Sequence, residues 1–198
     1  AEKSIRRAIA IKPDYADAHS NLGWVKLEKG DFDGAKKVLE KALRMKPDSP
    51  DTLQNLGTAL LNEGKAQEAI KCYKKAILLD PKRPNLRQSL GAALSENGDF
   101  EAAEASLNMA ISIDPHCAEA HRSLTRFKKY SAGDPHLKQM LSLLAENEFD
   151  AESRCHLYFA VAKAFEDLCD YATSFGYLKK GNSLRKKNLG YNASKEEL

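Results

Sequence analysis

The triplet Asn55-Leu56-Gly57 determines the fold, because related triplets recur at a fixed distance on either side of it. Asn21-Leu22-Gly23 lies 34 residues upstream, and Ser89-Leu90-Gly91 lies 34 residues downstream. One step further, Ser123-Leu124-Thr125 keeps the spacing but loses the glycine. Two more sets share the period: Ala8, Ala42, Ala76 and Ala110, and Pro13, Pro47, Pro81 and Pro115. The common period predicts an internal repeat in which each unit buries its apolar face against its neighbours.

The composition indicates an ordered, soluble chain with little net charge. Hydrophobic residues make up 42% and charged residues 30% of the 198 residues, which argues against disorder. A net charge of +3 is too small to predict nucleic-acid binding. No run of 18 or more apolar residues and no signal-peptide pattern occurs. We therefore expect no membrane contact and a cytoplasmic location.

The cysteines and histidines show no spacing that is typical of a metal site or a catalytic site. The four cysteines lack CxxC pairs and are interpreted as free thiols in a reducing compartment: Cys72, Cys117, Cys155 and Cys169. His19 and His121 share one repeat position and are interpreted as packing residues, whereas the other three histidines show no convergent spacing. No P-loop, nucleophile elbow or GxGxxG motif occurs. We expect no cofactor, metal or catalytic residue.

Each repeat is predicted to form two antiparallel helices. The first ends at Gly30, Gly64 or Gly98, where glycine supplies the positive φ of a tight turn, and the second ends near the periodic proline. Glycine in the middle of a first helix, as at Gly57, costs roughly 1 kcal/mol against alanine, so its recurrence predicts close approach of another helix. Residues 1–15 correspond to the second helix of a truncated unit, and the full repeats are 16–49, 50–83 and 84–117.

These features resemble the tetratricopeptide repeat (TPR), a helix-turn-helix unit of the same length. The resemblance covers residues 1–117 and lacks only the tryptophan of the pattern, which is replaced by His19, Leu53 and Arg87. It implies an all-α, right-handed solenoid of about eleven helices arranged as antiparallel pairs. In such a solenoid the first helices line the concave wall.

Two degenerate TPR-like pairs are predicted at 118–154 and 155–187, followed by a polar tail at 188–198. The first helix of the earlier pair is expected to run through Tyr130, and Asp134-Pro135 to start its second helix. A polar stretch from Glu146 to Ser153 interrupts the period. Cys169 stands where a turn glycine belongs.

Part of this second half has a resemblance of its own. Residues 128–136, 156–168 and 181–185 are similar to the connecting region of bacterial TPR proteins that carry a C-terminal sulfotransferase domain. The phosphate-binding Pro-Arg-Ser-Gly-type loop of that family is absent. Because Ala1 falls in the middle of a repeat, we expect a piece of a longer parent protein, and the resemblance implies a sulfotransferase domain in that parent.

The inner wall predicts a peptide-binding groove. Asn21 and Asn55 each carry an amide, which donates and accepts hydrogen bonds and suits the backbone of an extended peptide. The alternative is that these amides hold the neighbouring helix or face water. Trp24 is either a contact anchor or, as we slightly prefer, buried against the adjacent first helix. The predicted groove comprises Asn21, Trp24, Gln54, Asn55, Gln88 and Ser89.

A basic stripe is predicted further along the chain. Arg122, Arg126 and Lys129 recur at helical spacing, and Lys163 extends the set. Clustered cations suit a carboxylate or phosphate. The alternative is a solvated face balanced by Glu119 and Glu166.

Two functions follow from these patterns. The leading one is a non-enzymatic module that binds an extended peptide or protein segment in the concave groove. In the competing one, the repeats position substrate for an adjacent sulfotransferase domain of the parent chain, or pack on that domain. A third possibility, self-association through the truncated first unit, would be an artefact of the truncation.

Overall fold

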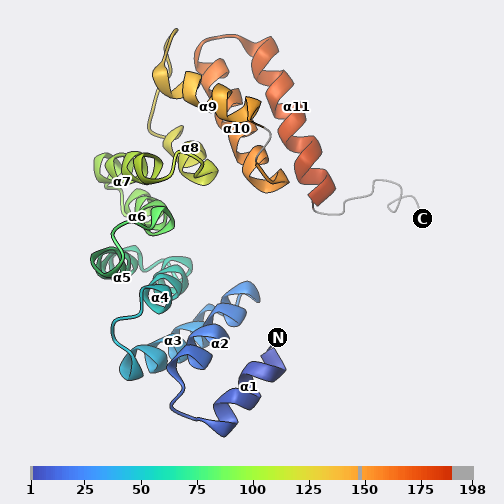
Figure 1. The fold of residues 1–198 in the computed structure, drawn as a ribbon. Coiled ribbons are helices and arrows are strands. Elements are labelled where there is room, and N and C mark those ends of the chain that lie inside the picture. Colours follow the sequence, from blue (N-terminus) through green and yellow to red (C-terminus); the bar gives the residue numbers. More distant parts are fainter. Residues whose placement is uncertain (1, 147–148, 189–198) are drawn as a thin grey trace, which may run out of the picture. The chain divides into compact units, whose positions relative to one another are not determined.

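The computed structural model describes residues 2–146 and 149–188, and the chain divides into two compact units, 1–113 and 114–198 (Figure 1). Within the described residues there are eleven helices and no strand, which confirms the predicted all-α fold of antiparallel helix pairs. The predicted polar tail at 188–198 lies outside the described residues, except for Asn188.

The first unit contains a single helix followed by three helix pairs. The pairs are α2 with α3, α4 with α5, and α6 with α7, as the 34-residue period predicts. Their bounds are α1 Glu2–Ile11, α2 Ala16–Glu28, α3 Phe32–Met45, α4 Pro50–Asn62, α5 Ala66–Leu79, α6 Pro84–Glu96 and α7 Phe100–Ile113.

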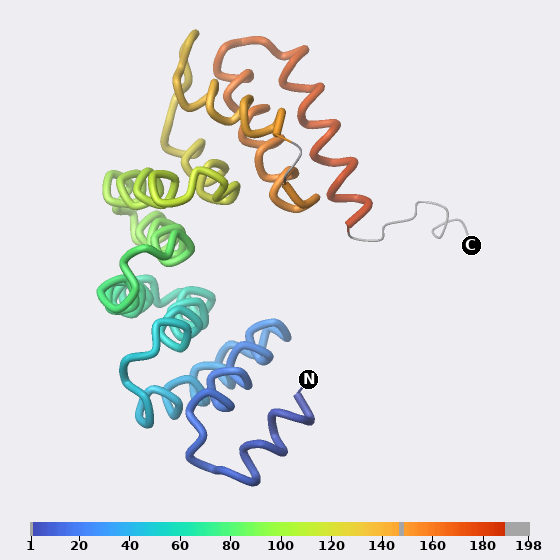
Figure 2. The backbone as a smooth tube through the Cα atoms, in the orientation of Figure 1, coloured from blue at the N-terminus to red at the C-terminus, as the bar shows by residue number. Residues whose placement is uncertain are grey.

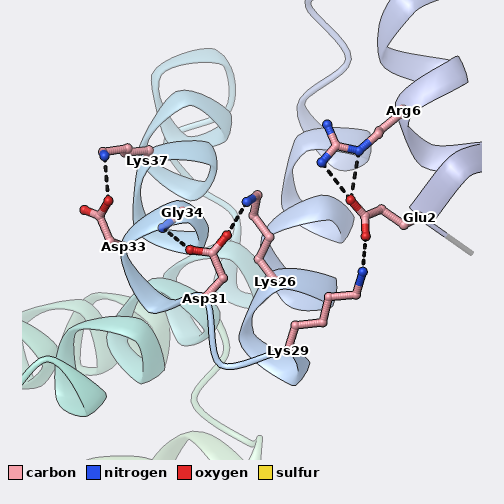
Figure 3. Close-up of polar contacts among 8 residues, drawn as sticks. All are labelled: Glu2, Arg6, Lys26, Lys29, Asp31, Asp33, Gly34 and Lys37. Atoms are coloured by element: carbon pink, nitrogen blue, oxygen red, sulfur yellow. Dashed lines mark hydrogen bonds and ion pairs between the residues drawn. The ribbon is translucent and has the colours of Figure 1, made fainter.

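The turn inside each pair depends on a glycine, as the sequence predicted. Gly30, Gly64 and Gly98 have φ values of 74°, 75° and 87°, in the left-handed region that favours glycine. After the first of these turns, Asp31 caps α3 by accepting a hydrogen bond from Gly34 N at 2.9 Å, and Lys26 pairs with the same carboxylate (Figure 3).

A cluster of charged residues ties α1 to the first pair. Glu2 accepts hydrogen bonds from Lys29 at the end of α2 and from Arg6 on its own helix (Figure 3). The hydrogen bond from Lys29, followed by that from Arg6, lowers the pKa of Glu2 to about 2. The contact is solvent-exposed, so it orients α1 more than it stabilises the fold.

The small residues in the first helices allow the two helices of a pair to approach closely. A Cβ atom added at Gly57 would lie 2.7 Å from Tyr73 Cε1, and one added at Gly91 would lie 2.8 Å from Leu107 Cγ. Gly23 meets Leu39 in the same way. Tyr73, Leu39 and Leu107 are almost completely buried, so the predicted reason for the glycines is confirmed.

The first helices of successive repeats form one row. α2 contacts α4 and α4 contacts α6, while α3 and α5 each pack on the first helix that follows (Figure 2). A buried hydrogen bond of 2.9 Å from Thr52 Oγ1 to Ser20 Oγ joins α4 to α2. The second helices make no comparable contact with one another within the described residues. The first helices are therefore the more closely spaced, inner row of this unit.

The second unit is built around α10. This helix, Ala151–Asp167, packs against α8 (Ala118–Leu124), α9 (Pro135–Ala145) and α11 (Tyr171–Asn188). Its core includes Leu137 and Met140 of α9 and Leu157 and Val161 of α10. The core of this unit is thus formed by long-range packing and no longer by the 34-residue repeat.

Two boundaries in the second unit differ from the sequence prediction. α8 ends at Leu124 and does not reach Tyr130, because Thr125 Oγ1 donates to the Arg122 carbonyl at 2.7 Å and the backbone N–H of Tyr130 donates to Asp167. α10 begins at Ala151, capped by Asp150, so the boundary predicted at 155 lies inside a helix.

Two other features of this unit agree with the sequence prediction. Asp134 caps α9 by accepting from the backbone N–H groups of His136 and Leu137. Cys169 adopts a φ of 60° at the turn between α10 and α11, where a glycine was expected.

Replacing Gly57 with alanine tests the close approach. Gly57→Ala should lower the free energy of unfolding by roughly 1–3 kcal/mol, because the added methyl group collides with the buried Tyr73 ring. Gly176→Ala on exposed α11 is the matched control: no atom lies within 4 Å of its Cβ position, so alanine should stabilise by up to ~1 kcal/mol. Urea denaturation followed by circular dichroism measures both. Equal effects of the two substitutions would contradict the packing argument.

Candidate functional site

The inner row of the first unit carries unpaired amides. Asn21 on α2 is exposed and Asn55 on α4 is half-buried, and neither side chain has a hydrogen-bond partner among the described residues. Neither amide therefore holds the neighbouring helix through a hydrogen bond, and the choice between a peptide contact and a side chain that faces water stays open. The Thr52 hydroxyl on α4 donates to Ser20 on α2 and so joins the two helices. Asn55 lies three residues after Thr52, and Asn21 follows Ser20 directly, so both amides lie beside this hydrogen bond.

The remaining predicted groove residues occupy the same row. Gln54 on α4 and Gln88 and Ser89 on α6 are half-buried. Ser89 stands at the repeat position of Asn21 and Asn55, so the three follow one another along α2, α4 and α6. The contacts between these helices bring the positions into one series, as predicted from the period.

Trp24 is exposed, contrary to the slightly preferred interpretation. Its relative exposure is 51%, so it is not buried against the adjacent first helix. It lies three residues after Asn21 and therefore on the same face of α2. The indole and the amide form adjacent contact groups on this face.

Two carboxylates of the row form ion pairs. Asp17 on α2 lies 3.2 Å from Lys46, and Asp51 on α4 pairs with Arg83. Both carboxylates are largely exposed, so these ion pairs contribute little to stability. The face therefore offers amides, an indole and the exposed carboxylates of Glu28 and Glu96, which have no ion pair among the described residues.

The predicted basic stripe does not form on one helix. Arg122 lies on α8, but the helix ends at Leu124, so Arg126 and Lys129 follow its end. Lys163 pairs with Asp167 one turn away on α10. Arg122 instead donates to His156 Nδ1 at 3.0 Å. Whether the four cations share an anion stays a prediction.

The sequence missed a buried chain of hydrogen bonds in the second unit. Tyr130, His136 and His121 follow one another at 2.7 Å, and His121 Nε2 lies 2.8 Å from the Pro115 carbonyl. The carbonyl only accepts, so His121 Nε2 donates and its Nδ1 accepts from His136 Nε2. His136 Nδ1 then accepts from the Tyr130 hydroxyl. Every ring nitrogen has a partner when both imidazoles are neutral.

Burial keeps the two imidazoles and the Tyr130 hydroxyl of this hydrogen-bond chain neutral. It lowers the pKa of His136 to about 4 and also lowers that of His121, while it raises the pKa of Tyr130. His121 and His136 therefore do converge, for a structural role that the one-dimensional spacing did not reveal. The packing role predicted for His19 and His121 is confirmed, since both are buried and bond to the carbonyls of Pro13 and Pro115.

Comparison with known families supports the repeat assignment over most of the chain. A tetratricopeptide repeat family model matches residues 1–59, 26–72 and 60–127. The chain belongs to the tetratricopeptide repeat family. A search of curated protein sequences returned no significant match.

Solved TPR structures are similar to this chain. MamA is 26% identical with a TM-score of 0.62, covering 86% of this chain and 98% of MamA. YrrB, described as a TPR protein with an unusual peptide-binding site, is 16% identical with a TM-score of 0.63 over 96% of both chains. A chain of the APC/C hetero-tetramer Cut9-Hcn1 is 16% identical with a TM-score of 0.75, covering 93% of this chain and 37% of its own length.

Membership of the TPR family indicates the general role of binding protein partners. Peptide binding in the groove and the link with a sulfotransferase domain stay predictions. TPR proteins bind protein partners, and the fold is generally non-enzymatic. The predicted link with a sulfotransferase domain is not addressed by these relatives and stays a prediction. Among the described residues, no helix combines the length and apolar character needed to cross a bilayer.

The buried histidine chain predicts a pH dependence of stability. The pKa of His136 falls from 6.5 in the unfolded chain to about 4 in the folded protein. Its contribution should be fully present above pH 6.5 and lost as the pH falls toward 4, because the unfolded chain then binds the extra proton. Urea denaturation at several pH values measures the loss, and NMR titration of the His136 ring measures the pKa. A ring that titrates near 6.5 in the folded protein would refute the neutral chain.

Proposed function

We propose that the inner row of α2, α4 and α6 binds the backbone of an extended peptide. The observation that carries this proposal is the series of unpaired amides on first helices that contact one another, beside an exposed indole. An amide that was satisfied within the protein would have no hydrogen bonds to offer a ligand. Asn21 and Asn55 retain both donor and acceptor.

The spacing of the row suits an extended chain. Packed helix axes lie roughly 8–10 Å apart, and an extended peptide rises about 3.3 Å per residue. Amides on successive first helices would therefore meet peptide groups about three residues apart. Ser89 continues the series with a shorter side chain, which favours a weaker contact or a bridging water at that end.

The rest of the face fits a ligand held mainly through its backbone. Trp24 offers a large apolar surface one turn from Asn21, which suits a single anchoring side chain of the peptide. Asp17 and Asp51 are already held in ion pairs, so the amides and the indole are the groups beside them that would contact the peptide. YrrB offers a precedent for peptide binding on this fold, and its identity of 16% carries the comparison no further.

Selection from a phage-displayed library of random 12-residue peptides supplies the ligand for the test. A selected peptide should change the emission of Trp24, the only tryptophan in the chain, because binding removes the indole from water. Asn21→Ala and Asn55→Ala should each weaken binding by about tenfold through the loss of amide hydrogen bonds, with little change in Tm.

Asn108→Ala is the matched control. Asn108 is an exposed asparagine on the second helix α7, outside the inner row, so its substitution should leave the affinity unchanged. If Asn108→Ala weakens binding as much as Asn55→Ala, or if no selected peptide alters Trp24 emission, the proposed groove is wrong.

A further inference from the structure

The second unit contains a cavity between three of its helices. Its volume is about 300 Å³, at the lower end of the range of small-molecule sites, so it suits a compact ligand. α8 contributes Arg122, α10 contributes four side chains, and α11 contributes two. The lining residues are Arg122, Glu152, Cys155, His156, Phe159, Arg185 and Asn188.

The guanidinium of Arg122 is held in place at one wall. It lies over the Phe159 ring, 5.2 Å from the centroid, and donates to His156 Nδ1 at 3.0 Å. A guanidinium has five N–H donors, and this contact occupies one of them. The stacking and the hydrogen bond thus orient Arg122 while leaving most of its donors available.

Arg185 brings a second guanidinium to the cavity from α11. It has no hydrogen-bond or ion-pair partner among the described residues. Burial raises the pKa of the Cys155 thiol, and the charges of Arg122 and then Arg185 act to lower it. The two positive charges therefore act on the same sulfur atom, although they come from helices on different sides of α10.

The acidic residues nearby do not neutralise this pair. Glu152 lines the cavity, and Glu119 lies 3.8 Å from His156 Nε2. Within the described ranges, neither carboxylate forms an ion pair with Arg122 or Arg185. The cavity thus holds two arginines with unused donors beside the apolar ring of Phe159.

We propose that Arg122 and Arg185 bind a small oxyanion in this cavity, a carboxylate or a phosphate group. Two guanidinium groups offer paired N–H donors that match the oxygens of either group. The Phe159 ring provides an apolar wall for the carbon atoms attached to a carboxylate. The site involves different residues from the predicted basic stripe, because only Arg122 is common to both sets.

His156 reports the occupancy of the site. Burial, which has the largest effect, and the charge of Arg122 lower the pKa of His156, while Glu119, Glu152 and Asp150 act in the opposite direction. A bound anion offsets the charge of Arg122 and therefore raises this pKa. NMR titration of the His156 ring with and without inorganic phosphate measures the effect.

Three probes distinguish the sources of the oxyanion: inorganic phosphate, an acetylated tripeptide with a free C-terminus, and its amide. Chemical shifts should move at residues 152–159 and 185, and the amidated tripeptide should bind at least tenfold more weakly than the free acid. Binding of phosphate alone assigns a phosphate site, and binding of the free acid alone assigns a carboxylate site. No binding of either would overturn the proposal.

Arg185→Gln is the decisive variant, because Arg185 is exposed and its loss leaves no internal partner unsatisfied. It should weaken the bound anion about tenfold and abolish the rise in the His156 pKa. Lys187→Gln removes the same charge two residues later, at an exposed position that does not line the cavity. It should change neither the affinity for the anion nor the rise in the His156 pKa. Equal weakening by both variants would reveal a nonspecific charge effect and refute the site. The test reports only on the second unit, so its outcome is independent of the peptide groove.

Discussion

The close approach of two helices at a glycine is the contact on which the first unit depends. At Gly23, Gly57 and Gly91 a buried Leu39, Tyr73 or Leu107 side chain occupies the space where a Cβ atom would lie. Each glycine weakens its own helix by roughly 1 kcal/mol, and the packing of a large buried side chain offsets that loss. Because the same contact recurs every 34 residues, every pair adopts the same geometry and the pairs stack.

This packing leaves the amides of the inner row unpaired. The contacts inside a pair are made by glycine, alanine and a few large side chains, and the contact between α2 and α4 includes the buried Thr52–Ser20 hydrogen bond. The polar side chains beside that junction are not needed to hold the helices. Asn21 and Asn55 therefore remain unpaired, which is the condition for offering their hydrogen bonds to a ligand.

The second unit achieves stability by a different route. Its core combines leucines, a methionine and Tyr130 with small residues such as Ala118, Ala160 and Ala164, and these come from α8, α9, α10 and the connection after α8. The irregular connection after α8 places Tyr130 against the end of α10 and allows the His121–His136 chain to form. His121 keeps the repeat position of His19, and the departure from the repeat brings His136 to it and places Arg122 and Arg185 at one cavity.

The sequence by itself determined the repeat, the helix pairs of the first unit, the glycine turns and the glycine contacts, because each depends on residues at fixed separations within one unit. The tertiary structure decided the exposure of Trp24 and the early end of α8. It also decided the contact between His121 and His136 and the position of Arg122 and Arg185 in the lining of one cavity. These features depend on helices that meet without a common period. No local spacing encodes where α8, α10 and α11 bring their side chains together.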